Sequence, residues 1–188
     1  RVFTAAGSEV FDRLVLATHS DQALALLAAP SDDERALLGA IGYQRNLAVL
    51  HTDTSVLPTR KRAWAAWNYE RAAEDGTERH RVCLHYLLNR LQPLPFAQPV
   101  IVSLNPVRPI DPAQVLQRID YAHPVFDLAA IAAQRHLHTL QGQAHTWYAG
   151  AWMGYGFHED GLQAGLAAAR ALLAAEAAAP VGAQAQAA

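Results

Sequence analysis

The chain has 188 residues, of which 52% are hydrophobic and 17% are charged, a composition that suits one large or two small globular domains. Its formal net charge of −2 gives no general basic field, so we expect no nucleic-acid partner. No apolar run approaches the roughly 20 residues that a membrane-spanning helix needs, and the first residues do not have the pattern of a signal peptide.

The single cysteine and the single methionine lead to two further expectations, one about the cellular compartment and one about the length of the complete protein. Cys83 is the single cysteine, which excludes an internal disulfide and is typical of a reducing compartment, so we expect a cytoplasmic protein. The chain starts at Arg1, and Met153 is its only methionine. We therefore expect these residues to be part of a longer protein, with any site completed by residues outside them.

The first forty residues predict a hairpin, a buried strand and two short helices. Residues 2–4 and the turn 5–9 precede the mostly apolar run 10–17, which is typical of a buried strand. Ser20 is a suitable cap for a helix over 21–28. Ser31 and Glu34 have the S-x-x-E spacing of a capping box, which predicts a second helix ending near Leu38.

The middle of the chain has a sequence pattern typical of an antiparallel sheet. Four apolar runs, separated by turn-rich segments, predict its strands: residues 46–54, 63–70, 81–91 and 100–104. Pro112 in the first turn of residues 111–119 predicts a short helix there. The spacing of apolar residues predicts another helix over 127–140.

The last part of the chain combines a short strand, a glycine-rich turn and the longest helix. The strand is expected at 146–149, the turn at 150–156 and the helix from 160 to about 177, with a low-complexity tail after it. Glycines let a ligand approach the backbone, and the first turn of a helix offers free N–H groups and a partial positive charge. The order therefore favours an anionic or carbonyl-rich ligand, although the G-x-x-x-G-x-G spacing is also compatible with a tight strand-to-helix connection that binds nothing.

The sequence resembles the flavin-containing amine oxidase-like oxidoreductases, and within them the bacterial group of predicted NAD/FAD-binding dehydrogenases. The resemblance runs from about residue 10 to 169. Its stretches are FDRLVLATHSDQALALL, LLGAIGYQRNLAVLHTDTSVLP, AWAAWNY, HPVFD, LQG and TWYAGAWMGYGFHEDGLQAGLAAA.

The resemblance implies an α+β fold in which an antiparallel-sheet substrate domain interrupts a Rossmann-like FAD-binding domain. The expected division is 1–40 for the end of the FAD-binding domain, 41–141 for the substrate domain, 142–178 for the closing FAD strand and helix, and 179–188 for a flexible tail. The G-x-G-x-x-G fingerprint of such proteins does not occur in these 188 residues. The expected partner is therefore an N-terminal segment of the same protein that carries it.

The resemblance also implies which residues contact FAD, the expected cofactor. They lie at the end of the strand expected at 10–17, in the glycine turn and at the start of the last helix: Ala17, Thr18, His19, Gly150, Ala151, Trp152, Tyr155, Gly156, Phe157, Asp160, Gly161 and Leu162. Relatives often have an acidic residue at the position where this sequence has Ala151. The helix start is expected to face the pyrimidine edge of the flavin, where reduced flavin carries negative charge.

The remaining polar residues give weaker expectations. His51, Asp53, Asn68 and Asn105 are the candidates for substrate contact, although ordinary hydrogen-bonded strand positions would explain them as well. Cys83 and His85 would share one face of a strand, which fits a nucleophile pair less well than a buried structural thiol. The histidines do not have metal-ligand spacing, and no metal is expected.

These observations lead to one expected function and one alternative. The first is an FAD-dependent oxidoreductase that transfers hydride from an unidentified small organic substrate to flavin N5, with no residue assigned as catalytic base. This chain by itself is expected to be inactive. The alternative is a noncatalytic module that binds a small molecule or lipid with the same fold.

Overall fold

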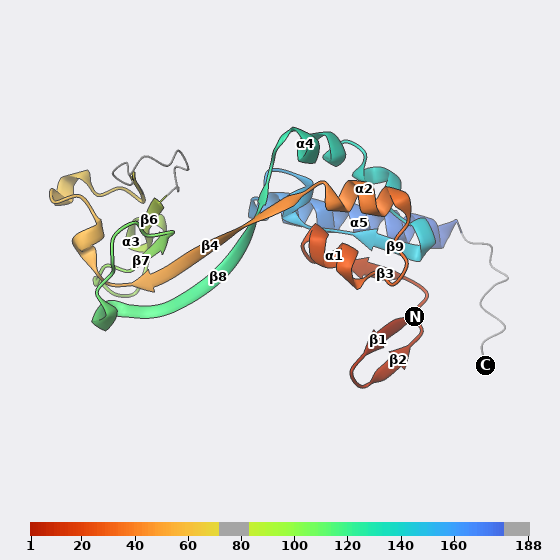
Figure 1. Cartoon of the computed structure of the whole chain (residues 1–188), viewed down its shortest axis with the longest axis horizontal. Coiled ribbons are helices and arrows are strands. Elements are labelled where there is room, and N and C mark those ends of the chain that lie inside the picture. Colours follow the sequence, from red (N-terminus) through yellow and green to blue (C-terminus); the bar gives the residue numbers. More distant parts are fainter. Residues whose placement is uncertain (72–82, 179–188) are drawn as a thin grey trace. The chain divides into compact units, whose positions relative to one another are not determined.

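A computed structural model describes residues 1–71 and 83–178, and these residues divide into two units. Unit 1 consists of residues 1–43 together with the chain from 124 onward, and unit 2 of residues 44–123. The strands β4 (Gly42–His51) and β8 (Val115–Val125) carry the chain from unit 1 into unit 2 and back (Figure 1).

The described chain mixes helices and strands in both units. Unit 1 contains β1 (Val2–Thr4), β2 (Gly7–Glu9), β3 (Leu14–Leu16), α1 (Ser20–Leu26), α2 (Asp32–Gly39), α4 (Leu128–Gln134), β9 (Thr146–Tyr148) and α5 (His158–Ala177). Unit 2 contains β5 (Trp67–Glu70), β6 (Cys83–Leu87), α3 (Leu88–Leu91) and β7 (Ile101–Leu104), besides β4 and β8. Among these helices, none has both the length and the hydropathy that crossing a membrane requires.

Unit 1 is built around a parallel strand pair. β3 and β9 pair in parallel with Leu14 opposite Thr146 and Leu16 opposite Tyr148. Parallel strands are normally covered by helices because the crossover connections place helices on their faces. The core of unit 1 follows this rule, with residues from β3, β9, α1, α2 and α4 in one buried cluster: Leu16, Ala23, Leu38, Ile41, Ala130, Leu137, Leu140, Tyr148 and Trp152.

The long helix α5 packs on β9 through small residues. Ala164 and Ala168 are buried against Trp147 and Ala149, which lets the helix axis approach the strand closely. Three leucines of α5 lie on an exposed stripe: Leu162, Leu166 and Leu173. The helix is therefore covered on one face only within the part of the chain that is described.

A buried hydrogen bond ties α2 to β9. The Tyr148 hydroxyl donates to Glu34 Oε1 at 2.6 Å, and Glu34 also closes the predicted capping box, in which the Ser31 amide donates to Oε2 and Ser31 Oγ accepts from the Glu34 amide. Burial opposes ionisation of Glu34, but the hydrogen bonds from Tyr148 and Ser31 outweigh it, so the pKa of Glu34 lies below its ordinary value. Burial, together with the negative charge of Glu34, raises the pKa of Tyr148.

Replacing Tyr148 with phenylalanine is expected to lower the free energy of unfolding by about 1–3 kcal/mol at neutral pH, because a buried carboxylate oxygen loses its donor. A lowered carboxyl pKa stabilises the fold above the unfolded-state value and loses that contribution as pH falls through the folded-state value. The difference between the two proteins should therefore shrink below about pH 4. Urea unfolding of both proteins at several pH values measures it. Tyr155→Phe, at an 83% exposed position, is the control, and an equal effect of the two substitutions would contradict the account.

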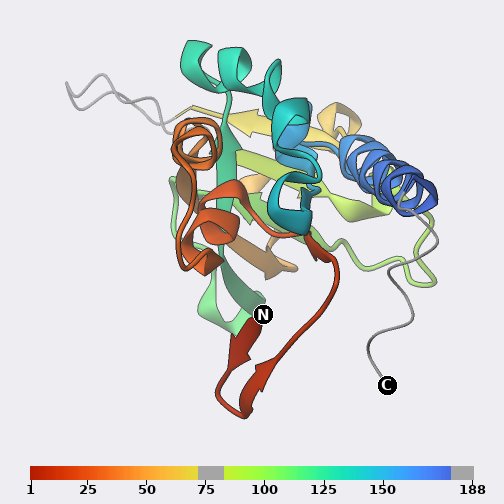
Figure 2. The same ribbon diagram turned by 90° about the vertical axis from the view of Figure 1, so that its right-hand side faces the viewer.

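The N-terminal hairpin β1–β2 stands off from the helices of unit 1 in both views (Figures 1 and 2). Its strands pair in the antiparallel direction, and the Thr4 hydroxyl braces the turn by donating to the Gly7 carbonyl and accepting from the Ala6 amide. Phe3, at 72% exposed, shows that this hairpin adds little to the core.

Unit 2 contains a five-stranded sheet in the order β5-β6-β7-β4-β8, with antiparallel pairing of β5 with β6, β6 with β7 and β7 with β4. The antiparallel character predicted from the short connections is thus confirmed for these pairs. Side chains along these strands point alternately to a buried face and to a more open face. The buried face contributes to an apolar cluster: Val49, Val56, Leu57, Leu87, Ile101 and Ile110.

Two predicted helices differ from the structure. The helix expected at 111–119 is wrong, because only the 3₁₀ turn η3 (Pro112–Gln114) forms there and β8 follows it directly. Asp111 caps that turn, and the Thr52 amide donates to the Gln114 carbonyl, so the segment starts pairing alongside β4. Pro124 is tolerated within β8 because β8 is an edge strand.

The helix expected at 127–140 is interrupted. α4 ends at Gln134, and a 3₁₀ turn, η4 (Leu137–Leu140), replaces its second half. Side chains of this segment bond backbone carbonyls locally, with His138 Nδ1 on the Arg135 carbonyl and the Thr139 hydroxyl on the His136 carbonyl.

The unit boundary also lies earlier than the expected 141/142. The chain joins unit 1 from residue 124, because Ala130, Leu137 and Leu140 belong to the core of that unit. The expected tail at 179–188 lies outside the described residues.

Candidate functional site

The carboxyl ends of β3 and β9 lie side by side. The Ala149 amide, just after β9, donates to the Leu16 carbonyl at the end of β3 at 3.1 Å. Each strand then continues through a loop into a helix, α1 in one case and α5 in the other. In α/β sheets, ligands bind in the crevice outside the carboxyl ends of parallel strands. This edge brings together residues 17–19 and 150–162, which are the two segments predicted to contact the cofactor.

Trp152 joins the two loops of this edge. Its indole Nε1 donates to the Thr18 carbonyl at 2.9 Å, and its side chain is 3% exposed within the core of unit 1. The family resemblance implied that Trp152 contacts the cofactor. Its ring is buried in protein instead, so it braces the loops while its neighbours Gly150 and Ala151 remain partly exposed.

The glycines of the turn are required by close contacts. A Cβ on Gly150 would lie 2.3 Å from Trp152 Nε1, and one on Gly154 would lie 2.4 Å from Asp160 Oδ1. The side-chain amide Nε2 of Gln134, on α4, donates to the backbone carbonyls of Trp152 and Gly154 at 2.9 and 2.7 Å. The turn is thus fixed from both sides, which makes it a preorganised surface.

The last helix begins two residues earlier than predicted. α5 starts at His158, because the Asp160 carboxylate accepts a hydrogen bond from the Phe157 amide at 2.9 Å and so caps the end from the third helical position. The Gly161 amide already donates to the Phe157 carbonyl at 3.2 Å. The amides at the free end are therefore those of His158, Glu159 and Asp160. Of the three residues predicted to offer amides to the flavin, only Asp160 lies among these free amides. The amides of Gly161 and Leu162 lie further inside the helix.

Large apolar side chains surround this helix end and are exposed. Tyr155 is 83% exposed, Phe157 65% and Leu162 56%. Gly156 beside them has a positive φ of 87°, which explains a glycine at this turn. Tyr155, Phe157 and Leu162 are therefore available to a ligand.

The loop after β3 is held by a stacked ring pair. The rings of His19 and Tyr43 stack at 4.5 Å with an interplanar angle of 15°, and the Ser20 amide donates to the Tyr43 hydroxyl at 2.8 Å. Ala17 is exposed, whereas Thr18 and His19 are half-buried. These three residues thus form a supported rim beside the glycine turn.

The residues predicted for substrate contact have internal partners. His51 is fully buried, with Nε2 at 2.7 Å from Ser103 Oγ and Nδ1 accepting from the Asp53 amide. The carboxylate of Asp53 accepts from the amides of Ser55 and Asp111. Burial lowers the pKa of His51, and it opposes ionisation of Asp53, whose hydrogen bonds nevertheless keep its pKa below the ordinary value.

Asn68 and Asn105 likewise shape the backbone. The side chain of Asn68 bonds both the amide and the carbonyl of Ala65. The side chain of Asn105 accepts from the Leu47 amide and donates to Asn46 Oδ1, which supports its own positive φ of 50°. The hydrogen bonds favour the structural interpretation of all four residues, and the burial of His51, Asp53 and Asn68 also argues against substrate contact.

Sequence reasoning missed the open face of the unit 2 sheet. This face, which we call the apolar sheet face, presents aromatic and aliphatic side chains from adjacent strands: Leu50, Trp67, Tyr69, Leu84, Tyr86, Val102 and Leu104. Trp67 and Tyr69 are 57% and 60% exposed, and the rings of Trp67 and Tyr86 meet edge to face at 5.4 Å. The alternation in WNYE and CLHYL was the available signal, but the pairing that joins the strands could not be inferred.

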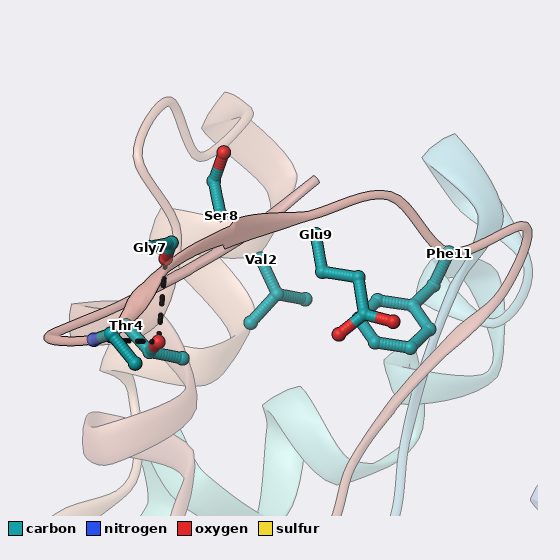
Figure 3. A pocket seen from close by; sticks show the side chains of 7 residues that line it. Val2, Thr4, Gly7, Ser8, Glu9 and Phe11 are labelled. Carbon is teal, nitrogen blue, oxygen red and sulfur yellow. Dashed lines mark hydrogen bonds between the residues drawn. The ribbon is translucent and has the colours of Figure 1, made fainter.

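A second surface feature lies on the N-terminal hairpin. Figure 3 shows a hollow lined by Val2, Thr4, Gly7, Ser8, Glu9 and Phe11. The hydrogen bonds of Thr4 there hold the hairpin turn, and Glu9 is the only charged lining residue. The hollow has no arrangement of groups that indicates a particular ligand.

No protein-family model matches the chain, and neither does any curated protein.

Proposed function

We propose that the protein is the C-terminal part of a cytoplasmic FAD-dependent oxidoreductase of the amine oxidase-like class. In this proposal, unit 1 supplies one side of the FAD site. A segment of the same protein bearing the dinucleotide fingerprint supplies the rest.

The observation that carries the proposal is the shared edge of β3 and β9. The two segments that resemble the flavoprotein family lie far apart in the sequence, yet the Trp152–Thr18 hydrogen bond and the Ala149–Leu16 hydrogen bond join them at the carboxyl ends of parallel strands. A ligand-binding edge of this kind is the feature that dinucleotide-binding folds share.

The charges at the start of α5 decide which part of FAD fits there. Glu159 and Asp160 place two acidic groups in the first turn. These groups disfavour a pyrophosphate, which is anionic. The neutral pyrimidine edge of oxidised flavin, flanked by Tyr155 and Phe157, suits this helix end better. The free amides can donate hydrogen bonds to N1 or O2 of that edge, and in this proposal these hydrogen bonds outweigh the repulsion between the two carboxylates and the charge that appears on reduction.

In this proposal, the residues of this chain bind FAD and orient its ring system. Bound FAD would supply the hydride acceptor at its N5 atom. The braced turn at 150–156 would hold the ring system against the first turn of α5, and the apolar side chains beside it would exclude water. No side chain of the described residues is assigned as catalytic base.

The apolar sheet face of unit 2 supports a substrate with an apolar body. Exposed aromatic patches on a sheet are uncommon unless they bind something. Among the polar residues first considered for this role, His51 and Asn68 are buried on the opposite face, and the side chains of Asp53 and Asn105 bond backbone amides. Trp67, Tyr69 and Tyr86 are therefore the better candidates for substrate contact.

The proposal is tested with the protein expressed from its complete coding sequence. We expect it to purify yellow, with the visible absorbance of bound flavin, and to gain about 2.7 kcal/mol of stability when FAD is present at 100 times its dissociation constant. A colourless protein whose melting temperature does not respond to FAD would contradict the proposal.

The second candidate function is a noncatalytic module that binds a lipid-like molecule, and the apolar sheet face is the observation that favours it. Anaerobic addition of apolar candidate substrates separates the two functions. Bleaching of the flavin absorbance indicates an oxidoreductase, whereas binding without bleaching indicates the noncatalytic module.

A further inference from the structure

A cluster of three potential metal ligands lies on the buried face of the unit 2 sheet. Glu70 on β5 is directly opposite Cys83 on β6, and His85 follows Cys83 two residues later on the same face. One ligand atom from each residue lies within 4.8 Å of the others. Cys83 and His85 are buried, and the Glu70 side chain is 22% exposed.

We propose that Glu70, Cys83 and His85 form a binding site for a borderline-soft divalent cation, best matched by Zn²⁺. Thiolate, imidazole and carboxylate are the three ligand types that zinc takes in proteins. Three protein ligands leave a fourth position for water or another small ligand. Glu70 is the ligand that reaches the surface, and it marks the route of entry.

The distances agree with tetrahedral coordination. Zinc bonds of about 2.3 Å to sulfur and 2.0–2.1 Å to nitrogen, at tetrahedral angles, separate the two ligand atoms by about 3.6 Å. Cys83 Sγ and His85 Nε2 are 3.5 Å apart. His85 Nε2 and Glu70 Oε2 are 2.9 Å apart, a hydrogen-bonding distance, whereas about 3.3 Å is needed around zinc. The partly exposed carboxylate can make this small movement.

The surroundings orient the ligands. Arg108 Nε donates to Glu70 Oε1, which leaves Oε2 directed at His85. His85 Nδ1 is 2.6 Å from Ser103 Oγ, as expected for a metal-binding histidine whose second nitrogen has a hydrogen-bond partner. Ser103 Oγ in turn lies 2.7 Å from His51 Nε2.

The hydrogen bonds also define the change that metal binding requires. Because His51 Nδ1 accepts from the Asp53 amide, neutral His51 donates from Nε2 to Ser103, which can then donate to His85 Nδ1. His85 therefore carries its proton on Nε2, toward Glu70. Metal binding moves this proton to Nδ1, where Ser103 accepts it, since a hydroxyl oxygen accepts two hydrogen bonds. Cys83 becomes a thiolate, and one proton is released to solvent for each cation bound.

Titration of the metal-free protein with Co²⁺, which substitutes for Zn²⁺, tests the proposal. We expect one equivalent to bind, with a thiolate-to-cobalt charge-transfer band, visible ligand-field bands of tetrahedral type, and displacement of both by Zn²⁺. The readout needs no flavin, so its failure is distinct from failure of the proposed oxidoreductase function. A wild-type protein that binds no Co²⁺, or binds it without the thiolate band, would overturn the proposal.

Substitutions locate the site. Cys83→Ser is expected to abolish the thiolate band, and Glu70→Gln to weaken binding by more than tenfold. Ser103→Ala, which removes the hydrogen-bond partner of His85, should weaken binding by about 10–100-fold. His136→Asn, at an exposed histidine of unit 1, is the matched control and should leave binding unchanged. Circular dichroism of the metal-free variants checks their fold, and an unchanged affinity in folded Glu70→Gln and Ser103→Ala would overturn the assignment.

Discussion

Gly150→Ala is expected to lower the free energy of unfolding by about 3 kcal/mol, the sum of overpacking and of a disrupted buried hydrogen bond. The new Cβ would lie 2.3 Å from Trp152 Nε1 and 2.6 Å from Cδ1. The indole cannot move away from the new Cβ without losing its packing in the core and its Nε1 hydrogen bond to the Thr18 carbonyl. Backbone strain is not the cause, since the φ of Gly150 is 167°, an extended value that any residue adopts.

The control for this prediction is Gly165→Ala on α5, where a new Cβ meets nothing within 4 Å. That variant should be neutral or more stable by up to about 1 kcal/mol, because alanine is the better helix former. Urea unfolding of both variants measures the difference. A double variant with Trp152→Leu should also show strong non-additivity with Gly150→Ala. Equal stability of Gly150→Ala and wild type would show that the loops are not fixed as described.

His158→Pro is expected to make the reduction potential of the flavin-loaded protein more negative by about 30 mV, which equals about 1.4 kcal/mol for a two-electron couple. His158 is the first residue of α5, where proline is tolerated and removes one free amide. Phe157 before it has φ −87° and ψ 164°, which is compatible with a following proline. Reduced flavin carries negative charge, so the hydrogen bond from this amide stabilises it more than it stabilises oxidised flavin. Loss of the amide therefore destabilises the reduced form more, and the reduction potential becomes more negative.

His158→Ala is the matched control, since it removes the same side chain but keeps the amide. We expect its potential to stay at the wild-type value, as measured by equilibration with a reference dye. If the proline and alanine variants have the same potential, the His158 amide does not meet the flavin.

Local sequence signals predicted the elements that frame the candidate site. The Ser31–Glu34 capping box forms as expected, and the strand–turn–helix order around Gly150 follows the glycine and aromatic spacing. The position of the helix start was wrong by two residues, because the sequence does not show that Asp160 caps the helix from its third position rather than preceding it.

Long-range pairing accounts for most of what the sequence could not show. Residues 115–119 belong to the segment expected to be helical, yet they form the first part of β8 because β4 offers an edge to pair with. Similarly, His51 and Asn68 were candidates for substrate contact or for ordinary hydrogen-bonded strand positions, and the strand register places both on the buried face. The apolar sheet face depends on the same register, so neither face could be assigned from one strand alone.

The placement of the flavin at the start of α5 is best tested by a crystal structure of the protein from its complete coding sequence with FAD bound. We expect N1 or O2 of the isoalloxazine to lie about 2.7–3.2 Å from a backbone amide among His158, Glu159 and Asp160. We also expect the ring system to pass beside the turn at 150–156. A helix start that is sealed by other parts of the protein, or an isoalloxazine bound elsewhere, would contradict it.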